Sequence, residues 1–179
     1  GREWKKNVEE ERLLGVSLTG LMDHPVLNHV CKDSKIWLTT MKQTAIDTAK
    51  EWSRLLGINV PAAITCVKPS GTVSELCGTS PGLHTRYAQH YIRRVRVSKI
   101  DPIATFLIEC GVPYHPEVGS TLEDCHTYVF EFPCQAPETS ITRDELSAME
   151  QLNYWHMLQK YWCEHKPSCT IYVKEHEWL

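Results

Sequence analysis

A chain of 179 residues, 42% apolar and 23% charged, is long enough for one domain with a sizeable core and is not a disordered tail. Its formal net charge of -3, with one short basic cluster at 91–99, argues against a dedicated nucleic-acid or membrane-surface binder. No apolar run reaches the length of a membrane span, and the first residues lack the apolar core of a signal peptide. We therefore expect a cytoplasmic protein that binds neither nucleic acid nor membrane.

The eight cysteines are spread along the chain without any Cys-x-x-Cys pair. In a chain of this size without a secretion signal, we expect reduced thiols, several of them in the core. Three short spacings bring a cysteine near a histidine: His29-x-Cys31, Cys125-His126 and Cys163-x-His165. These separations are shorter than the gaps of structural zinc sites, so no metal site is predicted.

Two helices and a compact connection are predicted in the first third of the chain. Residues 3–14 are charged and helix-prone, and Gly15 is expected to end this first helix. Small residues and glycines between apolar ones at 15–23 predict a close-packed turn or short strand. Apolar residues at steps of three and four predict a long helix over 34–56 that ends at Gly57. Its core stripe is expected to be Leu38, Met41, Ala45, Ala49, Trp52 and Leu56.

The residues 60–75 predict a strand, a tight turn and the start of a helix. Residues 60–67 form a short apolar run with β-branched members, which is typical of a buried strand. Lys68-Pro69 ends this strand, and Gly71 lets the backbone pass close to a ligand. Thr72 and Glu75 have the spacing of a capping box that opens a helix.

This turn is a candidate phosphate site. At a helix N-terminus, backbone N–H groups point outward beside the positive end of the helix dipole, and this arrangement suits an anion. Ser70, Thr72 and Ser74 add hydroxyls, and Lys68 adds a full charge. The spacing is not that of a P-loop. An ordinary capped helix after a strand is the alternative, and these residues alone leave both open.

The middle of the chain predicts a loop, a strand and a helix. Glycines and a proline at 78–84 make regular structure improbable, and we expect this loop beside the turn. Residues 91–97 predict a strand with arginines on both faces. Either one face meets solvent or an arginine pairs with phosphate. Asp101-Pro102 is expected to begin a helix that Cys110-Gly111 closes.

The last third predicts strand, helix and strand. Residues 127–132 and 168–174 alternate as strands, and the capping box at 142–145 is expected to open the helix between them. The buried stripe of that helix is predicted to be Ala148, Leu152, Trp155, Leu158 and Trp162. Because a helix lies in each crossover, this order predicts an α/β fold with largely parallel strands.

Four stretches resemble the large catalytic subunit of ribonucleotide reductase, most closely its adenosylcobalamin-dependent class. They cover the chain from end to end in the order of that family: ERLLGVSLTGLMD at 11–23, CVKPSGTVSELCGTSPGLH at 66–84, YIRRVRV at 91–97 and EQLNYWHMLQKYWCEHKPSCTIYVKEHEW at 150–178. The resemblance implies a single partial domain over 1–179, the later half of a ten-stranded α/β barrel. It also implies that the substrate phosphates are held by Pro69, Ser70, Gly71, Thr72, Val73 and Ser74.

The reaction that the resemblance implies removes the ribose 2′-hydroxyl by radical chemistry. A cysteine thiyl radical abstracts the 3′-hydrogen, and a cysteine pair supplies the electrons. The family's Asn-Leu-Cys segment does not occur in this sequence, and the tail cysteines would lie beyond residue 179. We therefore assign none of the cysteines to catalysis and expect the polypeptide alone to be inactive, with Cys66 packed in the core.

The cofactor and partners also follow from the resemblance. Reductases that receive their radical from a second subunit carry adjacent tyrosines on the last barrel strand, but here Val173 follows Tyr172. A valine cannot relay an electron, which favours a radical generated by adenosylcobalamin in the full-length enzyme. The implied partners are a ribonucleoside di- or triphosphate, the remainder of the reductase chain, and a thioredoxin-type or dithiol reductant. The alternative is a free-standing nucleotide- or phosphate-binding module without catalysis, and a purely structural domain is third.

Overall fold

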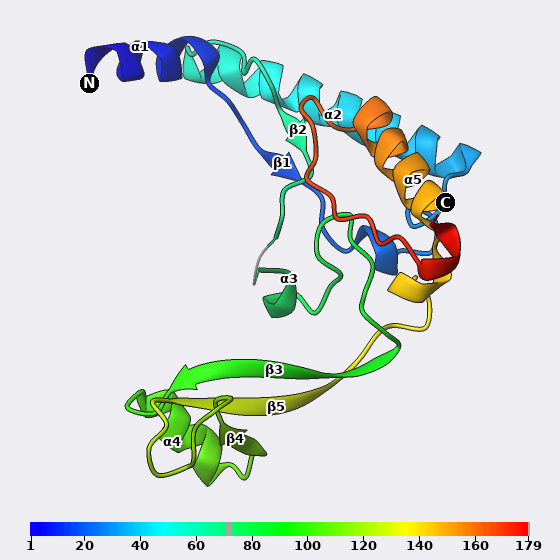
Figure 1. Cartoon of the computed structure of the whole chain (residues 1–179). Coiled ribbons are helices and arrows are strands. Elements are labelled where there is room, and N and C mark those ends of the chain that lie inside the picture. The colour runs from blue at the N-terminus through cyan, green and yellow to red at the C-terminus, as the bar shows by residue number, and fades with distance from the viewer. Residues whose placement is uncertain (71–72, 179) are drawn as a thin grey trace. The chain divides into compact units, whose positions relative to one another are not determined.

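The computed structural model describes residues 1–70 and 73–178, and the chain divides into two compact units. The first unit comprises Gly1–Tyr87 and Pro137–Leu179, and the second comprises Ala88–Ala136. Figure 1 shows the elements of both units. None of the helices in the described residues is long and apolar enough to cross a membrane.

The first unit begins with α1 (Arg2–Glu11), which is shorter than expected. Arg12, with φ 45°, ends the helix in the left-handed conformation, so the prediction that Gly15 ends it was wrong. The chain leaves the helix because its next backbone groups pair elsewhere. The N–H of Leu14 donates to the carbonyl of Ala63 at 3.0 Å, and that of Val16 donates to Ile64 at 2.8 Å.

This pairing leads into a short parallel sheet of β1 (Val16–Ser17) and β2 (Thr65–Cys66). The strand expected over 60–67 is thus reduced to two residues, because β1 offers a partner of only that length. After β1 the chain forms a 3₁₀ turn, η1 (Leu21–Asp23), whose first two residues are buried. The short strand and turn predicted at 15–23 are therefore present, but the close packing is limited to the turn, because Val16 and Ser17 are exposed.

The long helix α2 (Lys32–Leu56) is confirmed, including its end at Gly57, which has φ 66°. Its predicted stripe is only partly core. Leu38 and Ala49 are buried, whereas Trp52 is 57% and Leu56 63% exposed. The helix α5 (Ala148–Tyr161) packs beside the first half of α2, as Figure 1 shows, and leaves the second half uncovered on that side.

The start of α5 differs from the prediction. The capping box at 142–145 exists, but it opens a single 3₁₀ turn, η2 (Arg143–Glu145). A second capping box, Ser147 with Glu150, opens α5 itself. The buried face of α5 is formed by Gln151, Tyr154, Met157 and Leu158, and Trp162 just beyond the helix is also buried. Leu152 of the predicted stripe is 44% exposed, because the helix turns Gln151 and Tyr154 inward instead.

The predicted last strand over 168–174 is not formed. Its backbone N–H groups bond to side chains: Thr170 donates to Nε2 of His84 at 3.1 Å, and Tyr172 donates to Oε1 of Gln151 at 3.1 Å. The segment is therefore held by other elements without a strand partner among the described residues, and it ends in η3 (Glu175–Glu177).

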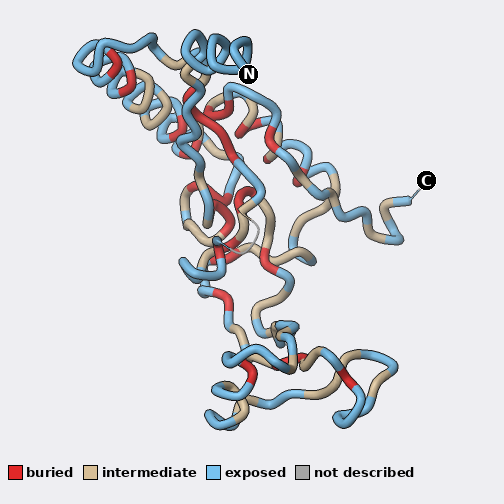
Figure 2. Tube along the Cα trace, turned by 90° about the vertical axis from the view of Figure 1, so that its left-hand side faces the viewer, coloured by how far each residue is buried: buried red, intermediate tan, exposed pale blue. Residues whose placement is uncertain are grey.

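The core of the first unit lies where α2, α5 and the end of β2 meet. Figure 2 shows buried residues concentrated there. This cluster consists of Leu21, Met22, Leu27, Leu38, Val67, Leu83, Tyr154, Met157, Leu158, Trp162 and Cys163. It fixes the end of β2, from which the predicted phosphate turn extends.

The second unit is an antiparallel sheet with one helix. Its strands lie in the order β3 (His90–Ser98), β5 (Thr127–Gln135) and β4 (Tyr114–Pro116). The expected parallel pairing therefore does not extend to this unit, since β5 returns along β3 in the opposite direction. The helix α4 (Pro102–Glu109) is capped by Asp101 and followed by Gly111 with φ 74°, as predicted.

Candidate functional site

The predicted phosphate turn, residues 68–74, follows the buried end of β2 and is called here the serine turn. Its first residue is anchored, because the backbone N–H of Lys68 donates to Oγ of Ser17 at 3.0 Å. The helix α3 (Val73–Leu76) follows, and Val73 N–H donates to the carbonyl of Ser70 at 2.9 Å. Gly71 and Thr72, with the predicted capping box, lie outside the described residues.

Three serine hydroxyls at this site are buried without a hydrogen-bond partner among the described residues. They are Oγ of Ser70, Ser74 and Ser80, and the side chains of the last two are fully buried. Most buried polar groups in proteins are hydrogen-bonded, because an unpaired one loses its bonds to water. The serine turn therefore carries hydroxyls that a ligand oxygen or a bound water would complete.

A loop at 77–84, called here the supporting loop, holds the serine turn. The N–H of Thr79 donates to the carbonyl of Ser74 at 2.9 Å. Gly82 has φ 54°, and a Cβ there would lie 2.9 Å from the carbonyl oxygen of Lys68. Only glycine combines this backbone conformation with so close an approach. The expectation that this loop lies beside the turn is confirmed.

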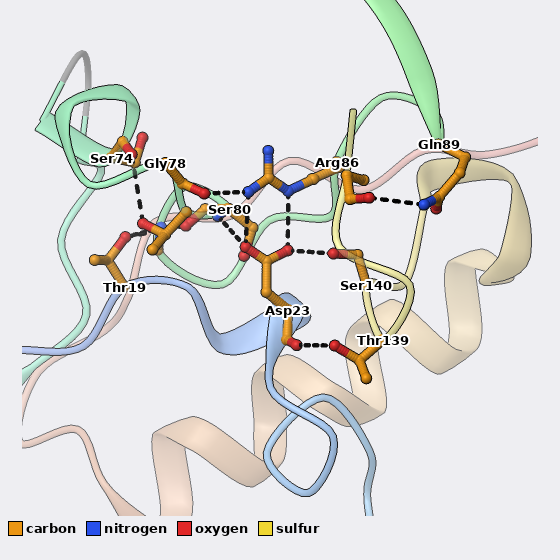
Figure 3. A network of polar contacts seen from close by, with 12 residues as sticks. Thr19, Asp23, Ser74, Gly78, Ser80, Arg86, Gln89, Thr139 and Ser140 are labelled. Carbon is orange, nitrogen blue, oxygen red and sulfur yellow. Dashed lines mark hydrogen bonds and ion pairs between the residues drawn. The ribbon is translucent and has the colours of Figure 1, made fainter. Parts of the chain in front are cut away.

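A buried ion pair lies behind the supporting loop (Figure 3). The guanidinium of Arg86 donates to both carboxylate oxygens of Asp23, from Nε at 3.0 Å and from Nη2 at 2.9 Å. Nη2 also donates to the carbonyl of Gly78 at 2.6 Å. The carboxylate of Asp23 accepts two further bonds at 2.7 Å, from the N–H of Ser80 and from Oγ of Ser140.

The electrostatics of this pair favour the charged form of Asp23. Burial by itself would raise the pKa of the carboxyl group. The bonds from Arg86, Ser140 and Ser80, together with the Arg86 charge, outweigh burial and hold the pKa of Asp23 below its ordinary value. The side chains are only 8% (Arg86) and 13% (Asp23) exposed, so water screens the pair little.

No pattern in the sequence singles out Arg86. The Arg86–Asp23 pair spans 63 positions, and Arg86 belongs to no local motif or periodic pattern. The arginines that the sequence did single out, Arg93, Arg94 and Arg96, belong to the second unit. There Arg94 is 64% exposed and pairs with Glu131 at 2.9 Å, which agrees with a solvent face at that position.

The cysteines are all free thiols, three of them buried. Cys66 is fully buried in β2, so its predicted place in the core is confirmed. Burial raises the pKa of the Cys163 thiol to about 11, which keeps it protonated and unreactive at neutral pH. Within the described residues, no group of three or more His, Cys, Asp or Glu side chains is placed to hold a metal ion.

No protein-family profile matches this chain. An adenosylcobalamin-dependent ribonucleoside-triphosphate reductase of Lactobacillus gasseri is 29% identical over 97% of this chain and 26% of its own length. A probable adenosylcobalamin-dependent ribonucleoside-triphosphate reductase of Dictyostelium discoideum is 32% identical over 89% of the chain. A reductase of the same name in Euglena gracilis is 30% identical over 94% of the chain.

A solved structure agrees with these relatives. The crystal structure of a B12-dependent, class II ribonucleotide reductase matches 93% of the chain with a TM-score of 0.82 and 25% identity. The match extends over 27% of that reductase. The described fold is therefore a portion of a ribonucleotide reductase α/β barrel, which confirms the predicted fold class.

These similarities show that the chain is related to ribonucleotide reductases over nearly all of its own length. More particularly, it is the counterpart of one segment of the adenosylcobalamin-dependent reductases. The chain spans between 20% and 26% of the length of the three relatives named above. This relationship favours a segment of a reductase over a free-standing phosphate-binding module.

Proposed function

We propose that this chain is the substrate-phosphate-holding segment of an adenosylcobalamin-dependent ribonucleoside-triphosphate reductase. The observation that carries the proposal is the set of unpartnered buried hydroxyls on the serine turn, at Ser70 and Ser74. The residues assigned to substrate phosphate are Pro69, Ser70, Gly71, Thr72, Val73 and Ser74.

The chemistry of this segment is recognition of an anion. Phosphate oxygens accept hydrogen bonds, and the Ser70 and Ser74 hydroxyls each have a donor to offer. Lys68 is exposed beside them and supplies positive charge. The supporting loop fixes the carbonyl of Ser74 through Thr79, so the hydroxyls are held before the ligand arrives.

The relatives' names describe their substrates as ribonucleoside triphosphates, and we propose the same class for the enzyme containing this segment. The two units would be parts of one partial domain, completed by the remainder of a reductase chain. A thioredoxin-type or dithiol reductant would return the electrons that the reduction consumes.

Adenosylcobalamin, when bound by the complete enzyme, would supply the initiating radical. Two grooves of the first unit are large enough to be compared with it. One of about 690 Å³ is lined mainly by apolar side chains such as Trp4, Leu14 and Trp52, and one of about 610 Å³ lies between α2 and α5. The apolar groove offers few partners to the amide groups at the edge of a corrin ring, and we assign no cofactor contact to this chain.

Amide chemical-shift mapping of the labelled 179-residue chain tests the phosphate assignment. Inorganic phosphate and a ribonucleoside triphosphate should shift the amides at 70–74 most, and base identity should matter little. Ser74→Ala should weaken binding, whereas Ser98→Ala, an exposed serine of the second unit, should leave it unchanged. If the largest shifts fall at Arg93, Arg94 and Arg96 while 70–74 stay still, the assignment is wrong.

A further inference from the structure

The Asp23–Arg86 pair holds both ends of one short segment of the supporting loop. Arg86 Nη2 donates to the carbonyl of Gly78 at 2.6 Å, and the N–H of Ser80 donates to Oδ2 of Asp23 at 2.7 Å. The same two side chains are joined to each other by two hydrogen bonds, so the segment 78–80 is attached to a rigid, bidentate unit. Figure 3 shows these contacts together.

The middle of this segment contacts the serine turn. The N–H of Thr79 donates to the carbonyl of Ser74 at 2.9 Å, and its hydroxyl lies 3.5 Å from the same oxygen. Gly20 packs behind Thr79, since a Cβ on Gly20 would lie 3.1 Å from Thr79 Cβ. Any displacement of 78–80 would therefore be transmitted to Ser74, whose hydroxyl is one of the unpartnered groups.

A second set of contacts fixes the far end of the segment. The carbonyl of Ser80 accepts from the N–H of Gly20 at 2.8 Å and from Oγ1 of Thr19 at 3.0 Å. The Thr19 hydroxyl oxygen in turn accepts from the N–H of Gly82 at 3.0 Å. The backbone on both sides of Thr79 is thus held from the 19–23 stretch and by Arg86, and Thr79 has little freedom to follow a moving turn.

We propose that Asp23 and Arg86 are positioning residues, which set the place of the Ser74 hydroxyl through Gly78, Thr79 and Ser80 and touch no ligand themselves. This inference rests on the proposed function of the serine turn. It gives the buried ion pair a role in fixing geometry rather than in stabilising the fold. Buried ion pairs are weak sources of stability, because desolvation offsets much of their attraction, but their directional bonds fix geometry.

Two conservative variants test the contributions of Arg86 and Asp23 separately. Arg86→Lys keeps the charge, but a single ammonium group lacks the planar fork that reaches Asp23 and Gly78 together. Asp23→Asn keeps the shape of the side chain. However, it replaces one carboxylate oxygen with an amide NH₂ group, which faces a hydrogen-bond donor and cannot accept from it. The matched control is Arg94→Lys, the same change in the exposed pair with Glu131.

The first measurement is amide hydrogen exchange of the ligand-free chain. Arg86→Lys should raise the exchange rates of Val73, Thr79 and Ser80 about tenfold, because local opening would no longer require breaking the forked contact. The amide of Trp162, which donates to Leu158 at the end of α5, should exchange as in the wild type. Arg94→Lys should leave all four rates unchanged. Equal increases at Trp162 would show a general loss of stability and overturn the proposal.

The second measurement is the affinity for inorganic phosphate at a temperature where every variant is folded. Asp23→Asn and Arg86→Lys should each raise the Kd about tenfold, whereas Arg94→Lys should not change it. Unchanged affinity despite faster exchange would show that the pair orders the loop only, and would overturn the inference. If the wild type binds no phosphate at 70–74, the proposed function fails, and the exchange rate of Val73 still decides whether the pair positions the turn.

Discussion

Two arginine–carboxylate pairs in this protein have nearly the same Nε–oxygen distance and very different surroundings. Arg86 Nε lies 3.0 Å from Asp23 in the first unit, and Arg94 Nε lies 2.9 Å from Glu131 in the second. Their arginine side chains are 8% and 64% exposed, respectively. The first carboxylate also accepts from Ser80 and Ser140, whereas Arg94 and Glu131 meet across neighbouring strands near solvent.

Contact distance therefore does not measure how much an ion pair contributes to stability. An exposed pair is weakened by water, salt and side-chain entropy, and typical values are about 0.2–1 kcal/mol. In a buried pair each partner depends on the other, because a single buried charge without its counter-ion is strongly unfavourable. The consequences of removing one arginine should therefore differ sharply between the two units.

The largest difference is expected for Arg86→Leu against Arg94→Leu. Arg86→Leu leaves the Asp23 carboxylate buried without its main partner and should lower the free energy of unfolding by about 3 kcal/mol. Arg94→Leu should lower it by less than about 1 kcal/mol. Urea denaturation of both variants at neutral pH measures this difference. Equal losses would show that burial does not distinguish the two pairs.

A second contrast uses two glycines with positive φ, one in each unit. Gly82→Ala introduces a left-handed alanine and a Cβ 2.9 Å from the carbonyl of Lys68, so we expect a loss of about 2 kcal/mol and displacement of the serine turn. Gly119→Ala, at φ 88° with open space around it, should show only the conformational strain of about 1 kcal/mol. Thermal denaturation gives the stabilities. A larger loss for Gly119→Ala would contradict the close approach at Gly82.

The pH dependence of stability sharpens the contrast without changing an arginine. The pKa of Asp23 is lower in the folded chain than in the unfolded chain, so its contribution is present above the unfolded pKa and is lost as pH falls through the folded value. Wild-type stability should therefore decline more steeply below about pH 4 than that of Asp23→Asn. Other carboxyl groups titrate in both proteins, so the difference between the two curves isolates Asp23. Parallel curves would refute the assignment.

The sequence predictions succeeded where structure depends on neighbouring residues and failed where it depends on residues distant in the chain. The ends of α2 and α4 were predictable, because Gly57 and the Asp101-Pro102 pair act on their own neighbours. The irregular structure of the supporting loop followed from its glycines and proline. Family resemblance, carried by the four matching stretches, supplied the reductase fold that elementary patterns left open.

Several failures share one physical cause, which is a partner distant in sequence. The segment 168–174 alternates like a strand, but its N–H groups bond to His84 and Gln151. The order of elements predicted parallel strands, but β3 and β5 pair antiparallel. Arg86 was not selected because its role depends on the ion pair with Asp23, and no local spacing in the sequence reveals that pair.

The smallest expected effect concerns two thiols and extends the comparison from charged pairs to cysteines. The hydrogen bond between the thiol of Cys31 and Oγ of Ser34, followed by the bond that the thiol accepts from the N–H of Ser34, lowers the pKa of Cys31 at the start of α2. Burial raises the pKa of Cys163 to about 11.

Since thiolate is the reactive form, iodoacetamide at neutral pH should modify Cys31 a few-fold faster than the exposed Cys110 and should spare Cys163. Ser34→Ala should remove the advantage of Cys31 over Cys110, as followed by mass spectrometry of digested peptides. Equal rates for Cys31 in the wild type and the variant would show that its exposure, rather than the bonds to Ser34, sets its reactivity.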